Sequence, residues 1–283
     1  MSLEEIRCIR AVDCHSHFGP VNCPAEEYPV ERLENGTTEF LLRRMEQANI
    51  GVSFNSSRLA LMPRGRGDSI RGNALMLEEV NKLPNVYMWV VINPLNQDTY
   101  RQAAEFLQHP KVVGLKVHPD EQLFSIREYG DEIYSFAAKH KAVLLGHSGE
   151  PNSMPEEYCK FANQYPEVQT IAAHLGCGSD GDFDHQIRAV EMNKYGNLYT
   201  DTSTARSLMA NIIEYAVQRI GSEKILFGTD SGIYFSPSQR IRIDCADIPD
   251  GDKRNILYRN GIRLFPFINL QQKHFADDQE EIK

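Results

Sequence analysis

Val12-Asp13-Cys14-His15-Ser16-His17-Phe18, near the N-terminus, is the stretch from which we begin to predict the fold and the function. Alternate side chains of a β-strand share a face, so His15 and His17 would point to the same side, with Asp13 one step further down that face. Two imidazoles aimed at one point suit a divalent ion such as zinc, which takes nitrogen ligands. A pair of hydrogen-bonded structural histidines would give the same pattern, and only the remaining sequence can separate the two interpretations.

The composition indicates a soluble globular protein, because 41% of the 283 residues are hydrophobic and 24% are charged. The net charge of -9 argues against non-specific binding to nucleic acid, which depends on Lys and Arg neutralising phosphates. The N-terminus lacks the apolar core of a signal peptide, and no segment approaches the roughly 20 apolar residues that span a bilayer. We therefore expect a cytoplasmic protein that binds neither nucleic acid nor membrane, with its six cysteines reduced.

Eight apolar segments alternate with eight predicted helices, and this alternation predicts the fold class. The predicted strands are residues 12–18, 50–55, 86–92, 112–117, 142–145, 169–173, 197–202 and 225–227. Uniformly apolar strands are typical of a closed parallel barrel, whereas an open doubly wound sheet usually has a glycine-rich phosphate loop after its first strand. This chain has Asp-Cys-His-Ser-His there. We predict an α/β protein with a single-domain (β/α)₈ TIM barrel over residues 1–274 and a solvated acidic tail at residues 275–283.

Polar residues follow several of these strands at their C-terminal ends, where barrel enzymes build their active sites. They are His15 and His17 on the first strand, Lys116 and His118 on the fourth, His147 on the fifth, His174 on the sixth and Asp230 on the eighth. Taken singly, each has an ordinary explanation as a satisfied polar group, a turn residue or a snorkelling lysine. Together they would be costly to bury unless they serve a metal or a substrate, so we predict a metal site.

These residues carry a resemblance to a known family. The motifs are VDCHSHFG at residues 12–19, GLKVHP at 114–119, AHLG at 173–176, NLYTD at 197–201 and LFGTD at 226–230. Their order resembles the amidohydrolase superfamily, and more narrowly the amidohydrolase-related branch that includes aminocarboxymuconate-semialdehyde decarboxylase and its relatives. The resemblance covers essentially the whole chain and implies a metal-dependent TIM-barrel enzyme.

The resemblance also implies roles for single residues. His15, His17, His147 and Asp230 would hold one divalent metal, usually zinc, while His174 and Asp230 would be catalytic. In binuclear members of the superfamily a carboxylated lysine on the fourth strand bridges two metals, and Lys116 occupies that strand, but a single metal is usual in this branch. His118 and Asp13 are candidates for supporting positions around the metal, although Asp13 could simply hold the first strand in place.

Two reactions fit the same ligands. We favour hydrolysis of a C–N or C–O bond, in a cyclic amide, a lactone or a similar small molecule, by a metal-activated water. The resemblance implies this preference, because the family's decarboxylases tend to carry larger insertions and substitutions around the first motif, whereas this chain is compact and keeps His-x-His. The alternative is non-oxidative decarboxylation, and a third hypothesis is an idle barrel that only binds. A carboxylated substrate would need an arginine, for which Arg58 is best placed among the arginines expected in loops, which also include Arg64, Arg66, Arg206, Arg240 and Arg242. The expected partners are a small-molecule substrate and, by default, a second copy in a homodimer.

Overall fold

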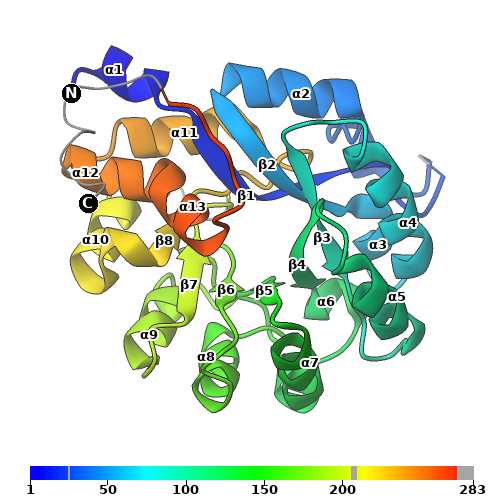
Figure 1. Cartoon of the computed structure of the whole chain (residues 1–283). Helices are drawn as coiled ribbons and strands as arrows, with labels where there is room; N and C mark the ends of the chain where they lie inside the picture. The colour runs from blue at the N-terminus through cyan, green and yellow to red at the C-terminus, as the bar shows by residue number, and fades with distance from the viewer. Residues whose placement is uncertain (25, 205–208, 273–283) are drawn as a thin grey trace.

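The computed structural model describes residues 1–24, 26–204 and 209–272, and Figure 1 shows how these segments are arranged. Within them the chain forms one barrel of strands surrounded by helices. The predicted domain end at residue 274, the acidic tail at 275–283 and the loop arginine Arg206 lie outside the described residues.

Eight parallel strands pair in chain order, which confirms the predicted TIM barrel. They are β1 (Ala11–Phe18), β2 (Ile50–Ser57), β3 (Val86–Val91), β4 (Val112–Val117), β5 (Val143–Gly146), β6 (Thr170–Ala172), β7 (Leu198–Asp201) and β8 (Ile225–Leu226). Backbone hydrogen bonds from Cys14 N to Phe227 O (2.9 Å) and from His17 N to Ser231 O (3.0 Å) join β1 to the segment that follows β8. The first and last strands are therefore neighbours, as barrel closure requires.

Helices lie between consecutive strands and form the outer layer of the barrel (Figure 1). The longer ones are α2 (Thr38–Gln47), α4 (Ser69–Val80), α5 (Asp98–Phe106), α7 (Ile126–His140), α8 (Pro155–Gln164), α9 (His185–Met192), α10 (Ile212–Ile220) and α11 (Ser236–Asp244). Short helical segments are α1 (Leu3–Cys8), η1 (Pro29–Arg32), α3 (Arg58–Leu61), α6 (Pro119–Gln122), η2 (Ser222–Lys224), α12 (Asp250–Arg254), η3 (Asn255–Arg259) and α13 (Asn260–Leu264). None of the helices in the described ranges is long and apolar enough to cross a membrane.

Among the longer helices, α11 was not predicted, because its sequence SPSQRIRID has little apolar periodicity. Arg240 holds it in place instead. Its buried guanidinium pairs with Asp244 (2.7 Å) and donates to the carbonyl oxygens of Ile6 (2.8 Å) and Ile9 (2.9 Å). Arg240, which we expected in a loop near the mouth of the barrel, therefore has a structural role in linking α11 to the N-terminal segment.

The interior of the barrel is apolar toward the N-terminal ends of the strands. Trp89 is fully buried there between Phe54 and Phe265, with ring centroids 6.1 and 5.6 Å away. Its indole Nε1 donates to the carbonyl oxygen of Cys14 (3.1 Å) at the base of the histidine motif. The polar residues of β1, β4, β5 and β6 follow this apolar layer in the strand direction, so it forms the floor beneath them.

We expect Trp89→Ala to lower the free energy of unfolding by about 3–5 kcal/mol, because it empties the centre of this floor. Trp89→Phe is the matched control, since it keeps an aromatic ring and loses mainly the hydrogen bond to Cys14, at a cost of about 1 kcal/mol. Urea unfolding of the three proteins measures both changes. A loss below about 1 kcal/mol for Trp89→Ala would show that this layer does not support the barrel.

Candidate active site

The histidine motif ends β1 with an irregular pairing to β2. The register shifts between Asp13 and Ser16, a β-bulge or irregularity that interrupts the simple alternation we assumed from the sequence. His15 and His17 line the central cavity, but Asp13 does not. Asp13 accepts hydrogen bonds from Thr229 Oγ1 (2.6 Å), Thr229 N (3.0 Å) and His15 N (3.2 Å). It thereby ties β1 to the loop after β8.

Asp230 meets both histidines at the C-terminal end of the barrel. Its Oδ1 lies 3.0 Å from His17 Nε2 and 3.7 Å from His15 Nε2. The backbone of Asp230 is in the left-handed region (φ 53°), which aspartate tolerates better than most residues, and its N–H donates to the carbonyl oxygen of His15 (2.8 Å). Three of the four predicted metal ligands therefore converge on one point.

The charge state of this group suits a cation. Burial would raise the pKa of Asp230, but the contact with His17 and the charges of the surrounding histidines outweigh burial, so its pKa lies below the usual value. Burial, together with the charge of Lys116, lowers the pKa of His15. The carboxylate is therefore ionised and the imidazole neutral at pH 7, which are the forms that bind metals.

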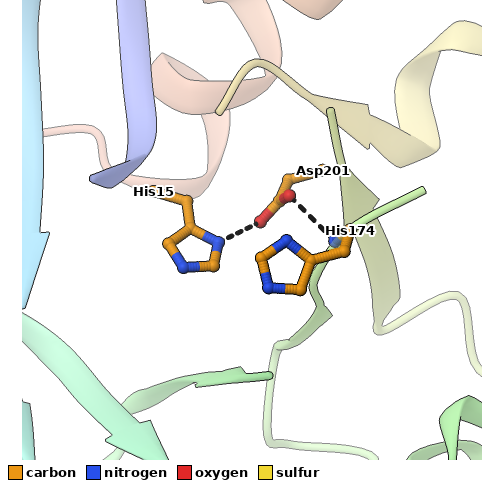
Figure 2. Close-up of side chains that lie close together, drawn as sticks. All are labelled: His15, His174 and Asp201. Atoms are coloured by element: carbon orange, nitrogen blue, oxygen red, sulfur yellow. Dashed lines mark hydrogen bonds and ion pairs between the residues drawn. The ribbon is translucent and has the colours of Figure 1, made fainter. Parts of the chain in front are cut away.

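A carboxylate on β7 orients two of the histidines, as Figure 2 shows. Asp201 Oδ2 lies 2.9 Å from His15 Nδ1, and Asp201 Oδ1 accepts from the backbone N–H of His174 (3.0 Å). His174 Nδ1 lies 3.2 Å from the carbonyl oxygen of Ser203 and 2.9 Å from its Oγ. These contacts place the ring proton of His15 and of His174 on Nδ1, so that each Nε2 carries a lone pair, which faces Lys116 Nζ in His15 and His147 Nδ1 in His174.

Sequence reasoning missed Asp201 and Ser203 as parts of the site. Asp201 does carry the signal that identified the other residues, since it is a polar residue at the C-terminal end of a buried strand. We expect Asp201→Asn to weaken metal binding about 10- to 100-fold, because a neutral amide oxygen is a weaker acceptor than a carboxylate for the N–H of His15 Nδ1. Competition with a chromophoric chelator measures this change, with thermal unfolding as a control for folding. Unchanged metal affinity would contradict the role given to Asp201.

His147 also lines the cavity and contacts His174. Its Nδ1 is 2.9 Å from His174 Nε2, and its Nε2 is 3.2 Å from Glu150 Oε2. The ring of His118 stacks on that of His147, with centroids 3.8 Å apart. The potential ligand atoms of His147, Asp120 and Glu150 lie within 4.8 Å of one another. His147 therefore belongs to a different group of potential ligands from His15, His17 and Asp230.

Lys116 reaches into the site from β4. Its fully buried Nζ lies 2.8 Å from His15 Nε2, and burial lowers the pKa of the amine to about 8. Lys116 thus occupies the strand position that the resemblance implied, in contact with a predicted ligand.

The residues present fit a divalent metal. Asp230 Oδ1 and His147 Nε2 are buried and form no hydrogen bond within the described part of the chain. A buried carboxylate oxygen without a donor is destabilising, and a cation bound between Asp230 and the two β1 histidines would satisfy it. The donor set of imidazole nitrogen and carboxylate oxygen is one that zinc and other transition metals accept.

A cavity of about 130 Å³ opens above this group. The predicted residues His15, His17, Lys116, His118, His147, His174 and Asp230 all line it. Arg64, one of the loop arginines named as candidates for binding a carboxylated substrate, lines it too, whereas sequence reasoning did not assign the other polar lining residues, which include Glu121, Glu150, Thr204 and Tyr234.

Arg58, our candidate for substrate binding, is not among the lining residues. It is fully buried, forms an ion pair with Glu34 (2.6 Å) and donates to the carbonyl oxygen of Gly19 (3.4 Å). Both partners belong to the segment between β1 and α2, which the guanidinium holds against the end of β2. The structure therefore gives Arg58 partners other than a substrate.

Comparison with known proteins places this geometry in context. The sequence model of a family described as amidohydrolase matches residues 12–267. No curated protein sequence matches the chain. Three solved structures match 91% of this chain at 14% sequence identity each. One is 2,6-dihydroxybenzoate decarboxylase from Rhizobium, with a TM-score of 0.69 and 98% of that chain covered. Another is dihydroxybenzoic acid decarboxylase from Polaromonas sp. JS666 with bound manganese and the inhibitor 2-nitroresorcinol, with a TM-score of 0.68 and 97% of that chain covered. The third is 5-carboxyvanillate decarboxylase from Sphingomonas paucimobilis, with a TM-score of 0.68 and 99% of that chain covered.

Our preference for a hydrolase is wrong, because these structural relatives are decarboxylases and agree with the alternative instead. The ligand set could not separate the two reactions, since both use the same metal and histidines. The compactness of the chain was also no guide, because the matches cover 97% to 99% of the decarboxylase chains.

Proposed function

This chain belongs to the amidohydrolase family, and we propose that it is a metal-dependent decarboxylase that removes CO₂ from a small carboxylated substrate without oxidation. The observation that carries the proposal is the end-to-end likeness to three decarboxylases. The cavity supports it, because it brings a candidate metal group and the proton-carrying side chain of His174 together in a space of about 130 Å³.

His15, His17 and Asp230 are the residues that would hold one divalent metal, with His147 as the candidate fourth ligand. A set of three imidazoles and one carboxylate favours zinc, whereas the Polaromonas structure contains manganese. A metal held there supplies positive charge that stabilises the negative charge left on the substrate when CO₂ departs.

The reaction breaks one C–C bond, leaves its electron pair on the substrate carbon and adds a proton to that carbon. His174 is placed to deliver this proton, because Ser203 fixes its Nδ1 and its Nε2 faces the cavity. With its own ring proton on Nδ1, His174 must first take up a proton from water on Nε2, and because burial lowers the pKa of His174 the ring then gives this proton up readily to the carbon. Asp230 stays ionised beside it and keeps the site anionic enough to retain a cation.

The experiment is an assay of the protein loaded with zinc or with manganese against aromatic and unsaturated carboxylates, with lactones and cyclic amides in parallel. The proposal expects CO₂ release that needs a metal. Ring opening of a lactone or cyclic amide, with no acid losing CO₂, would overturn it. Metal analysis of the purified protein decides between zinc, which we expect, and manganese.

A further inference from the structure

Arg64 reaches the mouth of the cavity from the loop after α3. Its side chain is 54% exposed, and the guanidinium contacts Glu121 through Nε (3.3 Å) and Glu150 through Nη2 (3.4 Å). Both contacts are single and long, and in the described part of the chain Nη1 has no partner. Exposed ion pairs of this kind are weak and exchange easily.

The loop that carries Arg64 is fixed, although the side chain is not buried. The N–H of Gly65 donates to the carbonyl oxygen of Glu121 (2.7 Å), and Asn22 Nδ2 donates to the carbonyl oxygen of Arg66 (2.5 Å). The backbone is thus bonded on both sides of Arg64, so the guanidinium can change partners while its anchor remains in place.

The other cations near the site are committed elsewhere. Lys116 Nζ lies against His15, whereas Arg58, which pairs with Glu34, and Arg66, which pairs with Glu27 (2.8 Å), do not line the cavity. Among the lining residues that the structure describes, Arg64 is therefore the arginine that can offer two N–H groups to a carboxylate.

The chemistry of decarboxylation indicates which carboxylate this would be. Negative charge leaves the departing carboxylate in the transition state, so a cation bound to that group would stabilise the substrate more than the transition state. A cation at the mouth is useful only for a group that keeps its charge throughout. Building on the proposed function, we infer that Arg64 binds a second carboxylate that the product retains, and that the substrate is a small dicarboxylate.

The cavity limits the size of this substrate. A cavity of about 150 Å³ holds one benzene ring, so the roughly 130 Å³ here accommodates a single ring or a short chain. The retained carboxylate would lie toward the open mouth, where Arg64 exchanges Glu150 for it while Glu121 still holds Nε.

The test compares binding of benzoate with that of the three benzenedicarboxylate isomers to the metal-loaded full-length protein by calorimetry. At least one dicarboxylate should bind about 10- to 100-fold more tightly than benzoate, as expected for a charge-assisted pair. Arg64→Ala should remove this advantage and leave benzoate binding unchanged, while Arg64→Lys should restore part of it. Arg66→Ala, in the same loop, is the matched control and should behave like the wild type.

Retention of the full dicarboxylate preference in Arg64→Ala, or its loss in Arg66→Ala as well, would overturn the inference. A parallel measurement of CO₂ release separates it from the proposed function. Release from monocarboxylates and dicarboxylates that is unaffected by Arg64→Ala would overturn the Arg64 subsite and support the decarboxylase. Dicarboxylate binding that depends on Arg64, without CO₂ release from any acid, would support the subsite and overturn the decarboxylase.

Discussion

Asp230→Asn should abolish stoichiometric metal binding and lower decarboxylation by about 10³-fold, a loss of several kcal/mol of transition-state stabilisation. Asp230 is the charged member of the group it forms with His15 and His17, and its Oδ1 has no hydrogen bond of its own. The amide has nearly the same shape as the carboxylate but no charge. Metal content by elemental analysis and kcat/KM with a carboxylated substrate measure the two effects.

Asp13→Asn is the matched control for this experiment. Asp13 is a second buried carboxylate close by, but its hydrogen bonds go to Thr229 and to the backbone of His15 rather than into the cavity. The substitution should lower the stability of the barrel and leave the metal content near one per chain. Loss of metal in Asp13→Asn together with its retention in Asp230→Asn would contradict the assignment of the ligands.

The barrel could be predicted because its strands are buried on both faces and are therefore uniformly apolar in the sequence. For the same reason the residues that break this pattern at the strand ends, such as His15, Lys116 and His147, could be recognised as candidates for one site. The order of the strands around the barrel is enough to predict that these residues lie close together, and no knowledge of side-chain contacts is needed.

The partners of those residues could not be predicted in the same way. Asp201 acts through His15, which is 186 positions away in the chain, and this contact exists only because the strands meet around the barrel. Which of Arg58 and Arg64 is available to bind a substrate depends on Glu34, because Glu34 forms a buried ion pair with Arg58. Two arginines six residues apart look equivalent in the sequence but differ in what surrounds them.

The reaction was mispredicted for a related reason. Hydrolysis and decarboxylation both need a polarising cation and a proton-carrying side chain, so the ligand motifs serve either reaction. What separates the two is the shape and charge of the cavity around the ligands, which loops such as the one that carries Arg64 supply. Those loops contribute almost nothing to the periodic pattern from which the barrel was predicted.

His174→Asn is the substitution that tests the proton-transfer role directly. The backbone of His174 is in the left-handed region (φ 72°), and asparagine adopts this conformation more easily than other residues apart from glycine, so the variant should fold. We expect kcat to fall about 10²- to 10⁴-fold, the usual contribution of a general acid or base. KM should change little, because the metal group and Arg64 remain.

Metal content decides how a loss of activity in His174→Asn is explained. His15, His17 and Asp230 form a group without His174, so the variant should keep one metal per chain while it loses turnover. Loss of the metal would instead make His174 a ligand, together with His147, whose Nδ1 lies 2.9 Å from its Nε2. Full activity with full metal content would show that the proton reaches the substrate carbon from another group, and Lys116 and His118, which also line the cavity, would then be the candidates.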